Sequence, residues 1–173
     1  MKKITLMAVA IMAAFTTNAF AQQESSAFVT SEASVVTPIT VTAGTALNFG
    51  TIAKGSLESV VTIDVDGIAV TTGDAVLVDT NGDAATAANF NVTGEAGYTF
   101  AITSPTEAIV LAGSGNATGS SMSFTATIPA TGTLDATSGE AVIPVTAALT
   151  VATAQASGTY SNAQDLAVTV YYN

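Results

Sequence analysis

The amino-acid sequence predicts an all-β protein built as a β-sandwich, with a barrel as the less favoured alternative. Apolar and polar residues alternate with a period of two along most of the chain, and turn-forming glycines recur at short intervals. Charged residues make up 9% of the chain, whereas about 25% is typical of soluble domains. Thr, Ser, Ala, Gly and Val take their place, and this composition suits short strands joined by small turns.

The expected strands follow one another along the chain. Residues 37–52 read as a strand, a glycine turn and a second strand, and residues 57–67 alternate Val61, Ile63 and Val65 with polar residues. Further strands are expected within residues 67–83, 88–105, 121–132, 139–158 and 158–173. Together these segments predict roughly seven to nine short strands, the number expected of a sandwich of this length.

Two of the later segments show their inward faces clearly. In residues 121–132, Met122, Phe124 and Ala126 fall on one face of the predicted strand. In the last segment of the sequence, apolar residues again share one face of the expected strand. These residues are Leu166, Val168, Val170 and Tyr172. A chain that ends inside an apolar strand is unusual, because terminal residues tend to fray. We therefore expect the strand around residues 164–172 to be held between neighbours.

Residues 1–21 are expected to be a secretory signal peptide. They combine a basic start, an apolar run and a small-residue ending with Ala19 and Ala21 at the positions that signal peptidase reads. Cleavage after Ala21 would leave 173 − 21 = 152 residues, enough for one domain. The apolar run is short for a membrane span, so no stable membrane insertion is expected after cleavage.

The charge of the exported chain argues against two classes of partner. Only Lys54 remains after residue 21, against 13 acidic residues, so the net charge is 1 − 13 = −12. Such a surface repels nucleic acid and anionic membranes. Solubility is the simplest reading of this charge.

Most catalytic chemistry lacks its side chains in this sequence. Residues 22–173 contain no His, Cys or Arg, which removes histidine triads, thiol nucleophiles, the usual zinc sites and guanidinium clamps on phosphate. The acidic residues are scattered through expected turns, and nothing in the sequence pairs two of them for glycoside cleavage. We expect no enzyme activity and no cofactor.

One loop resembles a calcium site weakly. Asp79, Asn81 and Asp83 fall at positions 1, 3 and 5 of an EF-hand-like loop. The sixth position is Ala84, where such a loop needs glycine, and the twelfth is Phe90, where it needs glutamate. A hairpin turn on Asn81-Gly82 is the favoured interpretation.

The segment before Pro38 is the most unusual feature of the chain. Residues 22–37, here called the arm, alternate like a strand, and a proline cannot donate to a sheet ladder, so Pro38 is expected to separate the arm from a sandwich domain at residues 38–173. The odd positions form a small, mostly apolar face: Ala27, Val29, Ser31, Ala33 and Val35. The arm could pair with a neighbouring molecule, pair within its own domain, or act as a flexible tether.

The two ends of the domain carry a resemblance to known families. "PITVTAGTALNFGTIAKG" and "GTYSNAQDLAVTVYYN" resemble the bacterial domain family DUF4402 over most of residues 33–173. The alternating arm, the all-β body and the penultimate Tyr172 also resemble fimbrial subunits of the chaperone–usher type, although the cysteine pair of the commonest pilins is missing. The second resemblance implies an immunoglobulin-like sandwich that lacks its last strand, which the arm of the next subunit supplies.

The function that this resemblance implies is structural. It predicts a subunit of a fimbria on the surface of a Gram-negative-type bacterium, which passes through the periplasm, polymerises with copies of itself and serves cell adhesion. A periplasmic chaperone and an outer-membrane usher would be its assembly partners. The arm face would then bind beside Leu166, Val168, Val170 and Tyr172 of a neighbour. The alternative is a self-contained secreted or periplasmic module that binds glycan or matrix.

Overall fold

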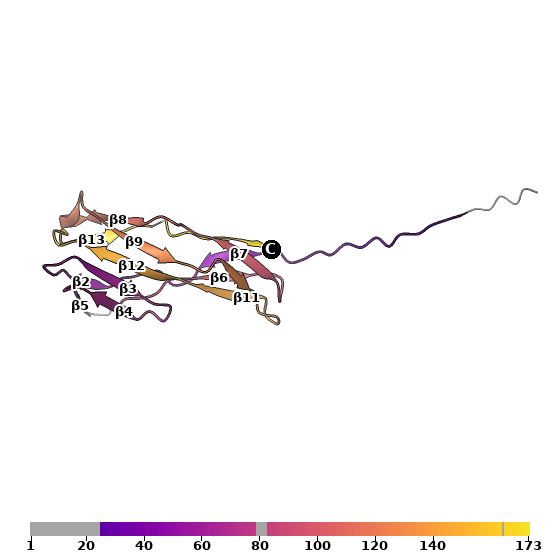
Figure 1. The fold of residues 1–173 in the computed structure, drawn as a ribbon, viewed down its shortest axis with the longest axis horizontal. Helices are drawn as coiled ribbons and strands as arrows, with labels where there is room; N and C mark the ends of the chain where they lie inside the picture. Colours follow the sequence, from indigo (N-terminus) through magenta and orange to yellow (C-terminus); the bar gives the residue numbers. More distant parts are fainter. Residues whose placement is uncertain (1–24, 79–82, 164) are drawn as a thin grey trace, which may run out of the picture. The chain divides into compact units, whose positions relative to one another are not determined.

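The structure is a computed structural model that describes residues 25–78, 83–163 and 165–173 (Figure 1). The described residues form an all-β fold of antiparallel sheets, consistent with the predicted β-sandwich. Fourteen strands and one short 3-10 turn, η1 (Gly115–Ala117), are found in them. The strands are β1 (Thr40–Ala43), β2 (Thr51–Ala53), β3 (Ser59–Ile63), β4 (Ala69–Thr72), β5 (Val76–Val78), β6 (Asn89–Thr93), β7 (Thr99–Thr103), β8 (Ile109–Ser114), β9 (Ser121–Thr127), β10 (Thr131–Thr133), β11 (Glu140–Pro144), β12 (Thr146–Val151), β13 (Thr159–Ser161) and β14 (Thr169–Tyr172).

Contacts between residues divide the chain into Met1–Ser34 and Val35–Asn173. The second unit, here called the body, contains all the strands of the described residues. It begins at Val35 and so includes the last three residues of the arm. Residues 25–34 are exposed and form no strand. Phe28 and Val29 keep 92% and 88% of their surface exposed, and Val35 keeps 96%. The apolar side chains of the arm therefore leave most of their surface in water.

The body is organised around one large sheet. It has six strands in the order β13-β8-β9-β12-β3-β4, and the remaining strands form the smaller sheets β1-β6-β11, β10-β7-β14 and β2-β5. The strand that begins at Glu140 changes sheet at Pro144, because β11 pairs with β6 whereas β12 pairs with β3 and β9. β2, β5 and β13 lie at one end of the body, and β6, β7, β11 and the C-terminus lie at the other (Figure 1).

Two apolar clusters fill the body. The first lies on the six-stranded sheet and contains Phe49, Val61, Ile63, Ile109, Met122, Phe124, Ala147, Leu149 and Val151. The second lies near the C-terminus and contains Val92, Phe100, Ile102, Leu134 and Ile143. Strand periodicity explains both clusters, since the buried positions in β3, β9 and β12 alternate with exposed or half-buried ones. In the absence of cysteine, this packing and the strand ladders hold the fold together.

Two strand expectations are wrong in detail. The number of strands exceeds the expected seven to nine, because glycine and proline divide long strands into short ones, as Pro144 does. Val65 does not continue the buried face of Val61 and Ile63, and it is 53% exposed. The strand ends at Ile63 because the Asp64 carboxylate accepts hydrogen bonds from the backbone N–H groups of Asp66 and Ile68, at 2.9 and 2.8 Å, and turns the chain.

The strand expected around residues 164–172 is shorter and lies at an edge. β14 starts at Thr169 and pairs with β7 along one side, and no strand of the described residues pairs with its other side. Gln164 lies outside the described residues. Val168, Val170 and Tyr172 are half-buried against the second cluster, whereas Leu166 packs against the first. The C-terminal segment 166–172 therefore contacts both clusters, and β14 itself packs on the second.

Tyr172 fastens the beginning of the body to its end. Its hydroxyl donates to the carbonyl oxygen of Thr37 and accepts from the backbone N–H of Glu95, both at 2.7 Å. The Glu95 carboxylate in turn accepts from the Thr37 backbone N–H at 2.8 Å, and this bond lowers the pKa of Glu95. The chain therefore enters the body at a point fixed by three hydrogen bonds, near the C-terminus.

We predict that the first cluster dominates the stability of the body. Val61→Ala should lower the free energy of unfolding by about 2–3 kcal/mol, because Val61 is fully buried and the deletion leaves a cavity. Val110→Ala is the matched control, since Val110 lies in the same sheet but is 51% exposed, and it should change stability by less than about 0.5 kcal/mol. Urea unfolding measures both, and equal losses would show that the first cluster is not the main core.

Candidate functional site

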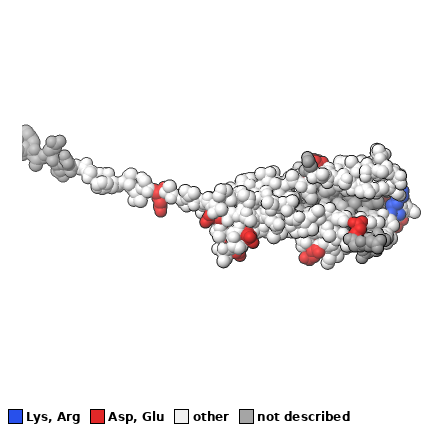
Figure 2. Space-filling model, turned by 180° about the vertical axis from the view of Figure 1, so that it is seen from behind, with Lys and Arg blue, Asp and Glu red and all other residues white. Residues whose placement is uncertain are grey.

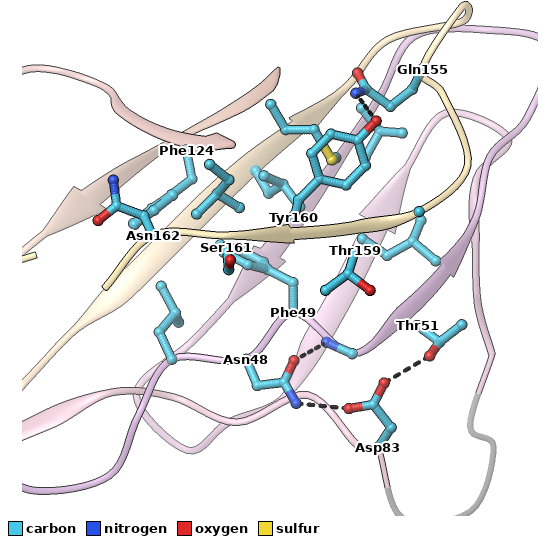
Figure 3. Close-up of a pocket in the computed structure, with 18 of the residues that line it drawn as sticks. Asn48, Phe49, Thr51, Asp83, Phe124, Gln155, Thr159, Tyr160, Ser161 and Asn162 are labelled. Atoms are coloured by element: carbon cyan, nitrogen blue, oxygen red, sulfur yellow. Dashed lines mark hydrogen bonds between the residues drawn. The ribbon is translucent and has the colours of Figure 1, made fainter. Parts of the chain in front are cut away.

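A cavity of about 720 Å³ opens in the body between the segments that contain β2 and β13 (Figure 3). One wall is the segment 46–54, which contains β2, and the other wall is the segment 155–163, which contains β13. The floor consists of side chains from the first cluster: Phe49, Ile109, Met122, Phe124, Leu149 and Val151. Leu166 also lines it. We call this cavity, with its two walls, the groove.

Each wall contains a strand that has one unpaired edge among the described residues. β13 pairs with β8 and ends the order of the six-stranded sheet, while β2 pairs with β5 alone. Among the described residues no strand pairs β2 with β13 across the groove. An unpaired edge carries a row of backbone N–H and C=O groups that can pair with another strand. The groove is therefore bordered on two sides by the hydrogen-bonding groups that an added strand requires.

The size of the groove is the second observation. Protein interiors are close-packed and contain few voids larger than a water molecule. The groove, at about 720 Å³, is far larger than such a void, and it lies over a floor of apolar side chains. Phe49 and Phe124 meet edge to face there, with ring centres 5.5 Å apart. Water gains little from such a floor, so the groove is suited to an apolar occupant.

A small polar network holds the wall that contains β2. The Asp83 carboxylate accepts hydrogen bonds from the Asn48 side-chain amide at 2.9 Å and from the Thr51 hydroxyl at 2.8 Å (Figure 3). The Asn48 side-chain oxygen accepts from the backbone N–H of Gly50 at 2.9 Å. The bonds from Asn48 and then Thr51 hold the pKa of Asp83 below its ordinary value. The network fixes the wall between Asn48 and Thr51, on either side of Phe49.

The opposite wall is held by Tyr160 and Gln155. The Tyr160 hydroxyl donates to the carbonyl oxygen of Ala156 at 2.7 Å and accepts from the Gln155 side-chain amide at 2.6 Å. The same amide also donates to the carbonyl oxygen of Ser121 at 3.1 Å. These bonds tie the loop before β13 to the large sheet. Both walls are thus supported independently of anything in the groove.

The calcium hypothesis receives no support from the described residues. Asp79 and Asn81 lie outside them, and the Asp83 carboxylate is occupied by Asn48 and Thr51. Within the part of the chain that is described, no three acidic, histidine or cysteine side chains gather as they would around a metal ion. The polar groups around the groove bind one another and hold its walls.

The predicted site residues fall in four places. Leu166 lines the groove, and Val168, Val170 and Tyr172 lie on the second cluster. Ala27, Val29, Ser31 and Ala33 belong to the first unit, and Val35 is an exposed residue of the body. Sequence reasoning missed the wall 46–54 and the loop at Gln155. The available signal was Phe49, a large aromatic residue between two glycine turns, which marks a buried point in that wall.

We predict that acid weakens the wall that contains β2. The folded-state pKa of Asp83 is lowered, so its contribution to stability is present above the pKa of the unfolded carboxyl group and is lost as pH falls through the folded value. Thermal unfolding of the wild type between neutral pH and about pH 3 should therefore show a steeper loss of stability than that of Asp83→Asn. Parallel curves for the two proteins would show that the Asp83 network does not support the wall.

No helix in the described ranges is long and apolar enough to cross a membrane. No curated protein and no solved structure matches the chain. Residues 39–172 match the model of one family, described as a domain of unknown function (DUF4402), and this confirms the resemblance that the two ends of the domain suggested. The match spans the body from β1 to the end of β14. The chain therefore belongs to the DUF4402 family.

Proposed function

We propose that the protein is a structural subunit that polymerises when the arm of one copy enters the groove of the next. The groove carries this proposal, because it combines an apolar floor with two unpaired strand edges. Strand addition to a sheet edge is a general mode of recognition, in which backbone hydrogen bonds give affinity and alternate side chains fill pockets. The proposal retains the fimbrial, immunoglobulin-like interpretation and assigns the place of the missing strand to the groove.

The arm has the properties that an occupant of the groove needs. It alternates with a period of two, so one face can point to the floor while the other points to solvent. Its odd positions are small and mostly apolar, and Val29, which is one of them, keeps 88% of its surface exposed. None of residues 25–34 is paired in a strand. Among the described residues, the groove thus lacks a paired strand over its apolar floor, and the arm is a strand-like segment without a pairing partner.

The direction of growth follows from the body alone. Thr37, the last residue of the arm, is held at the end of the body that carries the C-terminus, whereas β2 and β13 lie at the opposite end (Figure 1). The arm of one copy therefore leaves from one end, and the groove of the same copy opens at the other. This arrangement favours a head-to-tail contact, which forms an open filament when its rotation does not close a ring.

The energetics favour slow release over high equilibrium affinity. Burying Val29 contributes roughly 1.5–3 kcal/mol, and each backbone hydrogen bond adds about 0.5–1.5 kcal/mol. Ordering each arm residue costs about 1–2 kcal/mol of backbone entropy. The net gain from a short arm is therefore modest. A lasting fibre would depend on the barrier to withdrawing a fully inserted strand.

Export, surface location and adhesion belong to this proposal as well. An N-terminal signal peptide at residues 1–21 would deliver the chain to the periplasm, where a chaperone could cover the groove before an usher adds the subunit to a fibre. The role is non-catalytic. A self-contained glycan- or matrix-binding module is the alternative, and the groove of such a protein would hold its ligand without polymerisation.

The deciding experiment compares two arm variants with the full chain expressed in a Gram-negative bacterium. Val29→Asp places an unpaired charge against the apolar floor, at a cost of several kcal/mol, so multimers that resist cold detergent should be lost. Thr30→Asp is the matched control, because residue 30 lies on the opposite face of the arm, and it should assemble nearly as well as the wild type. Val36 would be a poorer control, since it is half-buried in its own body.

Deletion of residues 25–36 completes the design and should leave monomers. Equal assembly of the two aspartate variants, or normal multimers after the deletion, would contradict strand exchange. A wild-type protein that stays monomeric and binds glycan through the groove would instead identify the alternative function.

A further inference from the structure

Lys54 closes the mouth of the groove. It follows β2 in one wall, and its ammonium group donates to the backbone carbonyl oxygen of Gln155 in the other wall, at 2.5 Å. The side chain is exposed. Figure 2 shows it in blue at one end of the body, and it is the one cation among the described residues. The contact therefore joins the two walls at the end where an entering strand must pass.

The charge of Lys54 is not balanced within the described chain. Its hydrogen-bond partner is a neutral carbonyl group, and no described carboxylate forms an ion pair with it. The nearby Asp74 carboxylate accepts from the backbone N–H groups of Ser56 and Leu57 instead, at 2.6 and 2.9 Å. An ammonium group has three N–H donors, and the Gln155 carbonyl uses one. Lys54 can therefore donate to an anionic partner at the mouth of the groove.

The arm contains two acidic residues, Glu24 and Glu32, and Glu32 is the one that lies within the described residues. Among residues 25–37, Glu32 is the single ionisable side chain. It lies on the even face of the arm, so it points toward the rim when Ala27, Val29 and Ser31 face the floor. The chain after residue 21 thus has one cation, located at the mouth of the groove, and the arm has one anion from residue 25 onward.

The length of the arm is compatible with this pairing. In an extended conformation, at about 3.3 Å per residue, residues 25–32 span about 26 Å. With Glu32 at Lys54, the residues before Glu32 lie along the groove. Residues 33–37 then form a link of about 16 Å back to the body of the donor copy.

We propose that Lys54 recognises Glu32 of the arm of a second copy and so sets the register of the inserted strand. This inference rests on the proposed strand exchange. When the arm enters, the Lys54 ammonium leaves the Gln155 carbonyl and pairs with the Glu32 carboxylate. The freed carbonyl can then accept a backbone N–H from the arm. Lys54 is a specificity residue at the rim, and the apolar floor provides most of the affinity.

Charge reversal tests the pairing with the full chain. Lys54→Glu and Glu32→Lys should each slow polymerisation about two- to fivefold at low salt, the range expected for an exposed pair. The double variant should restore the wild-type rate, because the opposite charges meet again. The defect of each single variant should shrink at high salt, where exposed charges are screened. Glu107→Lys, which changes net charge by the same amount outside the groove, is the control and should not slow polymerisation.

The outcomes separate this inference from the function on which it rests. If deletion of residues 25–36 abolishes polymerisation but the double variant is no faster than the single variants, strand exchange stands and the Lys54–Glu32 pairing is overturned. If the deletion leaves polymerisation intact, strand exchange itself is overturned. Circular dichroism of each variant should match the wild type, and Lys54→Gln provides a second, uncharged variant that should show a smaller defect than Lys54→Glu.

Discussion

The apolar floor between two unpaired strand edges is the physical constraint on which the rest of the structure depends. An unpaired sheet edge has backbone N–H and C=O groups that can form hydrogen bonds, and an apolar floor is stabilised when other apolar groups cover it. An occupant that complements both must therefore provide backbone hydrogen bonds and apolar side chains. An extended strand does this, because its backbone pairs at the edges while every second side chain points inward. The groove of residues 46–54 and 155–163 has this combination. The polar networks of Asp83 and Tyr160 each support one of its walls.

The rest of the body can be understood as the frame for that groove. The second cluster closes the end near the C-terminus, where Tyr172 binds both Thr37 and Glu95. The first cluster packs on the six-stranded sheet, and some of its side chains, among them Met122 and Phe124, line the groove. With no cysteine to brace the fold, stability comes from packing and ladders. The groove therefore lies at the end of the body that the Tyr172 contacts do not close.

The sequence predicted the fold class and many inward faces well. Val61, Ile63, Met122 and Phe124 are buried as expected, because a strand with one buried face leaves a period of two that is visible without the structure. Val65 was misplaced because the Asp64 carboxylate ends the strand, and a side-chain turn of this kind interrupts an alternation that otherwise continues. The change of sheet at Pro144 also depends on tertiary pairing.

The groove could not be predicted from the sequence. Its walls lie about a hundred residues apart in the chain, and what defines it is the lack of pairing between them, which leaves no local signal. The arm, by contrast, was recognisable from its alternation and from Pro38. Lys54 could be singled out as the sole cation after residue 21, but its place across the groove from Gln155 required the fold.

Disulfide cross-linking between copies tests the central claim most directly, because the chain has no cysteine of its own. Cysteines would be placed singly at residues 28–32 of one copy, and Thr159→Cys, on the exposed rim of β13, would be placed in another. A disulfide forms only when the two Cα atoms approach within about 7 Å. Strand exchange predicts a disulfide between the two different copies, strongest at one arm position, in a mixture of the two variants. Polymers that form without any such cross-link would contradict it. A chain that carries both cysteines is the further test, and a disulfide found only within such single chains would also contradict strand exchange.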